Sequence, residues 1–211
     1  MLVDAIVLTG GRSSRLDAVS KSELVFAQET LLQRTLAAVR AARRIVVVGP
    51  DPVEPLPAGI LSAREDPPFG GPAAGIAAGM ASLTSSSTTT SDATLVLACD
   101  MPHVDRVIPR LLRGLIDNPE SDGVIAVDDG ERLQPLAAGY RTSRLASVIA
   151  AVGGAGPLDA LSVFRLIDGL NLVPIDVPIG ATADVDTWDD AHRLGVSIPR
   201  PPKNDQGRHH E

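Results

Sequence analysis

Short, continuous apolar runs recur along this chain. They consist mostly of Val, Ile, Leu and Ala and do not alternate with polar residues. Such runs indicate strands covered on both faces, because a strand with one solvent-exposed face alternates instead. The strands predicted in this way are Val3–Leu8, Arg44–Val48, Gly59–Ser62, Thr94–Cys99, Gly123–Val127, Leu136–Tyr140 and Leu172–Val177.

Segments with helical periodicity separate most of these runs. The alternation predicts a single-domain α/β fold: three Rossmann-like layers around a mainly parallel, mixed central sheet with right-handed crossovers. Pro72 and Pro157 suit the first turn of a helix, and Asp186 with Thr187 offer capping oxygens for the last helix. The predicted helices are Thr30–Ala42, Pro72–Leu83, Val104–Asp117, Ser143–Val152, Pro157–Ile167 and Thr187–Leu194.

Two polar segments interrupt or follow this pattern. Residues 82–92 read SLTSSSTTTSD, which predicts a flexible Ser/Thr loop inside a domain that spans residues 1–198. Residues 199–211 lack apolar side chains altogether, which predicts a disordered tail.

Composition excludes several classes of protein. The 211 residues carry a net charge of -7, whereas general nucleic-acid binding favours a basic face. No apolar stretch approaches the roughly 18 residues that a membrane span needs. The chain has one cysteine, which leaves neither an internal disulfide nor a thiol-rich zinc site. We therefore expect a cytoplasmic protein that binds neither nucleic acid nor membrane.

The segment AIVLTGGRSSRLDAVSK, residues 5–21, carries the first candidate site. An apolar strand ends at Gly10-Gly11, where no Cβ prevents backbone N–H groups from approaching a ligand. Arg12, Arg15 and Lys21 follow, against one acid, Asp17. The pattern is neither a Walker A loop nor a dinucleotide fingerprint, so it predicts a phosphate site of another type. The alternative is a glycine turn with solvated arginines.

A second loop of interest precedes a helix rich in small residues. Asp66 could accept hydrogen bonds from a base or a ribose. Ala73, Ala74 and Gly75, which follow Gly71-Pro72, leave room for a flat ligand near the backbone. The alternative is that these residues only form a turn and allow tight packing of the helix on the sheet.

Two further loops place carboxylates after predicted strands. Asp100 follows a buried run directly, where it could hold Mg²⁺ together with substrate phosphates. Asp184 and Asp186, two residues apart on an extended segment, point to the same side. One of them could be a second metal contact, or Asp186 could only cap the next helix. Cys99 is expected to be a buried core residue rather than a nucleophile.

These pieces, in this order, resemble the MobA-like nucleotidyltransferase family, and within it the molybdenum cofactor guanylyltransferases. The resemblance covers residues 4–195. It rests on Leu8-Thr9-Gly10-Gly11-Arg12-Ser13-Ser14-Arg15 with Lys21, Glu65-Asp66, Gly71-Pro72 with Gly75, Cys99-Asp100-Met101-Pro102 and Asp184-Val185-Asp186-Thr187.

The resemblance implies a nucleotide-diphospho-sugar transferase-like fold and a Mg²⁺-dependent reaction that moves GMP from GTP to molybdenum-bound molybdopterin. It implies transient contact with a protein that delivers the pterin. The catalytic residues would be Arg15, Lys21 and Asp100, with Asp100 and Asp186 as metal ligands. The nucleotide would be bound by Leu8, Thr9, Gly10, Gly11, Lys21, Asp66 and Asp100.

The chain departs from the family pattern at a few positions. Asp17 stands where a glycine is usual, Ser20 stands where an Asp often precedes the lysine, and Gln134 replaces a frequent His on the pterin side. Gly49 lies in a segment that carries a nucleotide-contacting Asn in some members. Two alternatives therefore stay open: a cytidylyltransferase or other transferase for a phosphorylated acceptor, and a nucleotide-binding regulatory protein whose catalysis has decayed.

Overall fold

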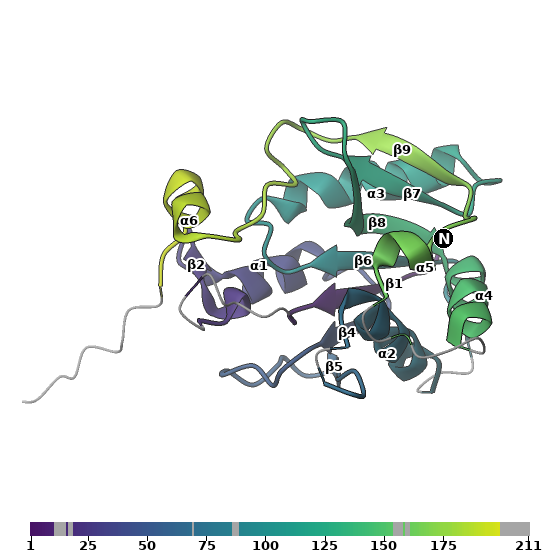
Figure 1. Ribbon diagram of the computed structural model, residues 1–211, viewed down its shortest axis with the longest axis horizontal. Helices are drawn as coiled ribbons and strands as arrows, with labels where there is room; N and C mark the ends of the chain where they lie inside the picture. Colours follow the sequence, from purple (N-terminus) through teal and green to yellow (C-terminus); the bar gives the residue numbers. More distant parts are fainter. Residues whose placement is uncertain are drawn as a thin grey trace, which may run out of the picture.

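A seven-stranded sheet forms the centre of the computed structural model, which describes residues 1–10, 16, 19–68, 70–85, 89–153, 158 and 161–198. Helices lie on both faces of this sheet (Figure 1). The strands are β1 (Val3–Leu8), β4 (Ile45–Val48), β5 (Leu61–Ala63), β6 (Ala93–Ala98), β7 (Gly123–Val127), β8 (Leu133–Arg141) and β9 (Leu172–Asp176). The helices are α1 (Leu31–Ala38), α2 (Pro72–Ser85), α3 (Val104–Asp117), α4 (Thr142–Gly153), α5 (Val163–Leu166) and α6 (Trp188–Leu194).

The sheet is mixed and mostly parallel, in the order β5-β4-β1-β6-β8-β7-β9. β8 runs antiparallel to both of its neighbours, whereas the other pairs are parallel. From β1 the chain first adds β4 and β5 on one side and then returns to add β6 on the other. The strand order therefore reverses between β1 and β6. In open α/β sheets, ligands bind at the carboxyl ends of the strands beside such a reversal.

Successive side chains of the central strands point to opposite faces of the sheet and pack in two separate hydrophobic cores. In β1, Ala5 and Val7 face the core that contains α1 and α3, and Ile6 and Leu8 face the core that contains α2, α4 and α5. All four side chains are buried. This two-sided burial explains why the strand reads as a continuous apolar run, and it confirms the predicted three-layer α/β fold.

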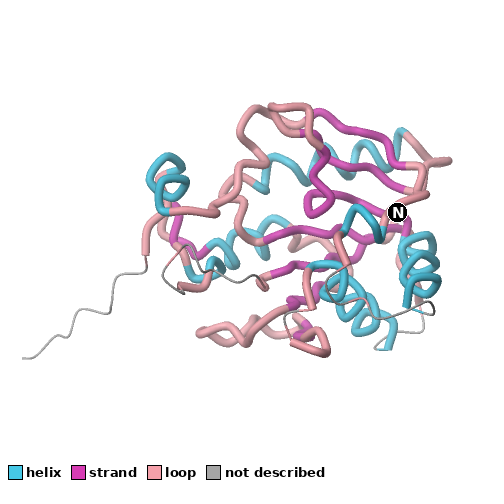
Figure 2. The backbone as a smooth tube through the Cα atoms, in the orientation of Figure 1, coloured by secondary structure: helices cyan, strands magenta, loops and turns pink. Residues whose placement is uncertain are grey.

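A third, smaller core lies beyond the carboxyl ends of β1 and β6. Figure 2 shows α6 there, set apart from the helices that flank the sheet. It packs with the 3-10 turn η1 (Lys21–Glu23) and the hairpin of β2 (Val25–Phe26) and β3 (Glu29–Thr30), around Leu16, Leu24, Leu31, Val185, Ala191 and Val196. This small core anchors two segments far apart in the sequence next to the same strand ends.

Several predicted boundaries were wrong for local reasons. The strand predicted from Gly59 begins at Leu61, because Gly59 has a φ of 89° and the Ile60 N–H closes a turn on the Pro57 carbonyl. The loop predicted from residue 82 begins later, because α2 continues to Ser85 and the Thr84 hydroxyl donates back to the Met80 carbonyl.

The remaining differences concern short elements. Part of the helix predicted over Pro157–Ile167, including Pro157, lies outside the described residues; in the described part it corresponds to α5, where the Ser162 hydroxyl accepts from the Arg165 N–H and so caps the start. β2, β3 and η1 were not predicted, because elements of two or three residues carry no periodicity. The predicted tail, residues 199–211, lies outside the described residues. None of the helices in the described ranges combines the length and apolarity required to cross a bilayer.

Candidate active site

The glycine loop and the loop that carries Asp100 meet where β1 and β6 end. The two strands pair in register up to Leu8 and Ala98, and the Cys99 N–H then donates to the Leu8 carbonyl at 3.0 Å. Thr9 and Gly10 leave β1 at this point, and Asp100 leaves β6. The sheet thus brings the start of the glycine loop beside Asp100. Gly11, Arg12, Arg15 and Asp17 lie outside the described residues.

Gly49 lies directly against the start of the glycine loop. The Thr9 N–H and hydroxyl both reach the Val48 carbonyl, at 2.9 and 3.2 Å. A Cβ at Gly49 would lie 2.4 Å from the Thr9 hydroxyl oxygen and 2.8 Å from the Gly10 nitrogen, and its φ is 144°. Only glycine therefore allows this approach. From the sequence, Gly49 was noted only because some family members have a nucleotide-contacting Asn in this segment. In the structure, glycine is required here so that the glycine loop can pack against β4.

Lys21 points into the site from η1. Its ammonium donates to Asp100 Oδ2 at 2.7 Å and also to Asp186 Oδ1. The Lys21 side chain is 17% exposed, and the neighbouring Ser22 and Leu24 are buried, which fixes the turn that carries it. Burial opposes its charge, but attraction and hydrogen bonds from Asp100, with those from Asp186, outweigh this and raise the Lys21 pKa. The ammonium therefore stays charged throughout the neutral range.

Three carboxylates converge around this lysine. One oxygen from each of Asp100, Asp184 and Asp186 lies within 4.8 Å of the others. Val185 between the latter two is fully buried, and its N–H donates to the Asp100 carbonyl at 3.1 Å. Loss of solvent, followed by repulsion from Asp100 and Asp186, raises the pKa of Asp184. The sequence had left open which of Asp184 and Asp186 would contact a metal, and the family resemblance had implied that role for Asp186 alone.

The cluster has the donor set of a site for a hard divalent cation. Magnesium and manganese prefer carboxylate oxygens and accept phosphate oxygens as further ligands. The alternative role for Asp186, capping the last helix, was wrong. Thr187 is the N-cap of α6, and it forms a capping box in which Asp190 supplies the second side chain.

The segment around Asp66 lies farther along the same edge of the sheet. It follows β5, which is the outermost strand beside β4, and Asp66 is exposed. Glu65 is nearer the glycine loop, since its Oε1 lies 3.8 Å from a Cβ built on Gly10. The small residues of α2 serve packing: Ala73 is buried, and a Cβ on Gly75 would lie 3.2 Å from Leu8 Cδ2. For them the packing interpretation was correct.

The turn between β7 and β8 borders the site on the other side. Asp128 accepts from the backbone N–H groups of Gly130 and Arg132, and from the side chains of Arg132 and Gln134, at 2.8–2.9 Å. Asp129 accepts from the Gly180 N–H at 3.0 Å. The hydrogen bond between Gly180 and Asp129 connects this turn to the segment that leads to Asp184.

Two nearby groups are structural. Cys99 is 2% exposed, and burial together with the Asp100 charge raises its pKa, so the thiol is not a nucleophile at neutral pH. His103 packs edge-on against Phe26 with ring centroids 5.1 Å apart. The prediction that Cys99 is a buried core residue is therefore confirmed.

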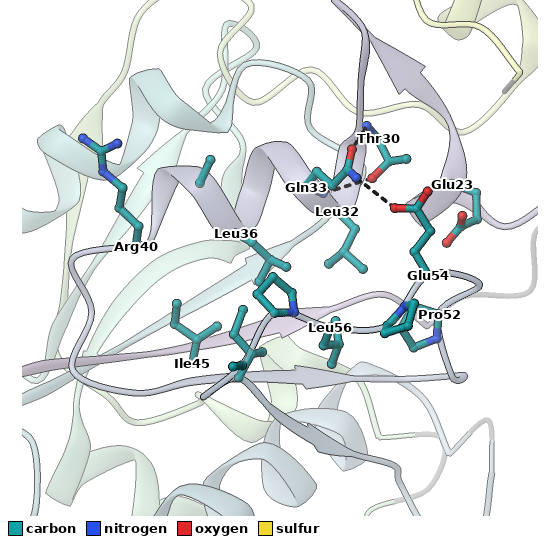
Figure 3. A pocket seen from close by; sticks show the side chains of 15 residues that line it. Glu23, Thr30, Leu32, Gln33, Leu36, Arg40, Ile45, Pro52, Glu54 and Leu56 are labelled. Atoms are coloured by element: carbon teal, nitrogen blue, oxygen red, sulfur yellow. Dashed lines mark hydrogen bonds between the residues drawn. The ribbon is translucent and has the colours of Figure 1, made fainter.

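A separate cavity of about 430 Å³ lies between α1 and residues 52–60 (Figure 3). Its walls are Leu32 and Leu36 of α1, with Ile45 and Leu56 opposite, and Gln33 donates to Glu54 at its rim. Neither Lys21 nor Asp100 lines it, so it is distinct from the carboxylate cluster.

Comparison with known proteins gives consistent similarities. The family model of the MobA-like NTP transferase domain matches residues 5–179. A Clostridium perfringens (strain SM101 / Type A) protein named probable molybdenum cofactor guanylyltransferase is 28% identical over 139 residues. The match spans 66% of this chain and 66% of that relative, just under two thirds of its length.

Two solved structures share the fold. Molybdopterin-guanine dinucleotide biosynthesis protein A from Archaeoglobus fulgidus has a TM-score of 0.65 at 21% identity, over 90% of this chain and 96% of that one. 2-C-methyl-D-erythritol 4-phosphate cytidylyltransferase from Thermus thermophilus has a TM-score of 0.61 at 20% identity, over 90% of this chain and 96% of that one. Both similarities support the nucleotidyltransferase-like α/β fold predicted from the sequence.

Proposed function

Because this chain belongs to the MobA-like NTP transferase domain family, we propose that it is a nucleotidyltransferase that transfers GMP from GTP to molybdenum-bound molybdopterin. The terminal phosphate of the acceptor attacks the α-phosphorus of GTP, a new P–O–P bond forms, and pyrophosphate leaves. The observation that carries this proposal is the contact of Lys21 with Asp100 and Asp186 at the reversal point of the sheet. That point is where open α/β sheets bind phosphorylated ligands.

The protein's part in this reaction is positioning and charge stabilisation. Gly10 has no Cβ of its own to keep the phosphates from its backbone, and the close contact with Gly49 keeps that backbone in place. Lys21 is held charged and would stabilise the pyrophosphate leaving group, with Arg15 as a second cation. Leu8, Thr9, Gly11 and Asp66 complete the proposed nucleotide contacts, with Asp66 toward the guanosine.

Asp100 and Asp186, together with Asp184 as a third ligand, are the residues that would hold Mg²⁺. Their oxygens are close enough together for one ion, and carboxylates with substrate phosphates are its usual protein ligands. When bound, the ion neutralises phosphate charge during transfer. Asp184 and Asp186 lie beyond the segment matched by the family model. We therefore assign residues 1–198 to one transferase unit.

The test is a pyrophosphate-release assay with GTP, CTP, ATP or UTP, with Mg²⁺ and the molybdopterin acceptor. We expect GTP to be preferred and Lys21→Met or Asp100→Asn to lower the rate about 10²-fold or more. Arg113→Gln provides the control, because it removes a charge that is 74% exposed on α3. Full activity in both site variants would contradict the site assignment.

The other outcomes identify the alternatives. A preference for CTP would make the chain a cytidylyltransferase for the same or another phosphorylated acceptor. Stabilisation by nucleotide without turnover in wild type would favour a regulatory protein, for which Asp17, an acid where the family usually has glycine, offers a reason.

A further inference from the structure

Lys21 occupies the place of a cation within the carboxylate cluster. It donates to Asp100 at 2.7 Å and to Asp186, two of the three carboxylates whose oxygens lie within 4.8 Å of one another. The same ammonium is the phosphate-binding group in the proposed function. It therefore has two sets of partners, the carboxylates and a triphosphate.

We propose that Lys21 is an internal counter-ion that competes with the divalent cation for Asp100 and Asp186, so that the metal binds tightly only together with a nucleoside triphosphate. This inference rests on the proposed function in taking Lys21 as the lysine that contacts the phosphates. It goes further by fixing an order of events at the site.

The geometry supplies the physical reason. An ammonium in direct contact with Asp100 Oδ2 and Asp186 Oδ1 competes with a metal for those two oxygens. A cation brought to the same oxygens would also be repelled by the ammonium over a few ångströms, a repulsion that water screens in part because the Asp186 side chain is 51% exposed. The Lys21 side chain is only 17% exposed, so it cannot turn freely into solvent.

A triphosphate removes this obstacle. Its oxygens offer Lys21 a new anionic partner, and they also supply metal ligands that the three carboxylates alone do not. Release of Lys21 by the nucleotide frees Asp100 and Asp186 for the ion. By linkage, the nucleotide then raises metal affinity and the metal raises nucleotide affinity by the same factor.

The first measurement is Mn²⁺ binding by electron paramagnetic resonance without nucleotide. We expect Lys21→Met to bind Mn²⁺ about tenfold or more tightly than wild type, since the variant removes the competing charge. Arg34→Gln is the matched control, because its side chain is 19% exposed and its acidic partners, Glu29 and Asp105, lie outside the cluster. Equal Mn²⁺ affinity in wild type and Lys21→Met, or an equal gain in Arg34→Gln, would overturn the proposal.

The second measurement uses wild-type protein, so it does not depend on the folding of a variant. The chain has two lysines, Lys21 and Lys203, so selective lysine labelling gives a simple side-chain NMR spectrum that Lys203→Arg assigns. We expect Mg²⁺ alone to leave the Lys21 Nζ signal in place and GTP with Mg²⁺ to shift it. A full shift with Mg²⁺ alone would refute the competition.

These results separate the two proposals. A Lys21 shift with GTP and Mg²⁺ but no pyrophosphate release supports the competition and contradicts the transferase reaction. Pyrophosphate release combined with equal Mn²⁺ binding by wild type and Lys21→Met contradicts the competition alone.

Discussion

Replacing Gly49 with alanine tests whether the close approach of β4 to the glycine loop matters. The new Cβ would lie 2.4 Å from the Thr9 hydroxyl oxygen and 2.8 Å from the Gly10 nitrogen, the latter a backbone atom of the loop itself. The φ of 144° is also unfavourable for an L-residue. Both effects act at the place where the proposed phosphate loop leaves β1.

The expected magnitude follows from adding these two effects. A strained backbone conformation costs about 1–3 kcal/mol. Overpacking that forces neighbours to move costs about 1–3 kcal/mol more. We therefore expect the free energy of unfolding to fall by roughly 2–6 kcal/mol in Gly49→Ala, and nucleotide affinity to fall because Gly10 must shift.

Gly59→Ala is the matched control. Gly59 also has a positive φ, of 89°, but a Cβ there would meet no atom within 4 Å. It should lose only the backbone part, about 1–3 kcal/mol, and keep nucleotide affinity. At about 2–4 °C per kcal/mol for a chain of this size, thermal melting monitored by circular dichroism resolves the difference. Equal losses of stability and equal nucleotide affinity in the two variants would refute the reasoning.

Two further predictions concern stability. Arg43→Met should lower the free energy of unfolding in urea by about 3–5 kcal/mol, because it leaves the buried carboxylate of Asp4 without the guanidinium that contacts both of its oxygens. A loss below about 1 kcal/mol, as expected for an exposed pair, would contradict this. Asp190, whose pKa is lowered to about 2 by Arg193 and Thr187, stabilises the fold above its ordinary pKa of 3.8. This contribution, about 1 kcal/mol for a capping interaction, should disappear as pH falls from about 4 to 2. Denaturation of wild type across this range should show the loss, whereas Asp190→Asn should lack it.

The chain's own pattern was sufficient for the layers of the fold. β1 was predicted with its full extent, because Ala5 to Leu8 are buried on both faces and all apolar, and the one buried acid of the strand, Asp4, is paired with Arg43. α3 was predicted with the same bounds, because its apolar positions follow the helical period. The candidate residues Gly10 and Asp100 were identified because each directly follows an apolar strand, and Lys21 because it adds positive charge to the loop after Gly10 and matches the family pattern.

Short elements could not be found in this way. β2 and β3 have two residues each, and β2 is stabilised on its outer side by a bridge from Val25 to Ser197. Because Val25 and Ser197 are far apart in the sequence, no local pattern predicts that they pair. The same holds for Gly49, whose requirement for glycine arises from contact with Thr9 and Gly10, about 40 positions earlier.

Local sequence determined which segments are strands and helices, because burial on one or both faces fixes the spacing of apolar residues along the chain. It also determined which loops carry reactive groups. Tertiary structure alone decided that Lys21 meets Asp100, 79 residues away, and Asp186, 165 residues away. The physical reason is that the reversal of strand order between β1 and β6 and the small core around Val185 bring these side chains together. Charge–charge contacts over a few ångströms depend on that placement and leave no period in the sequence.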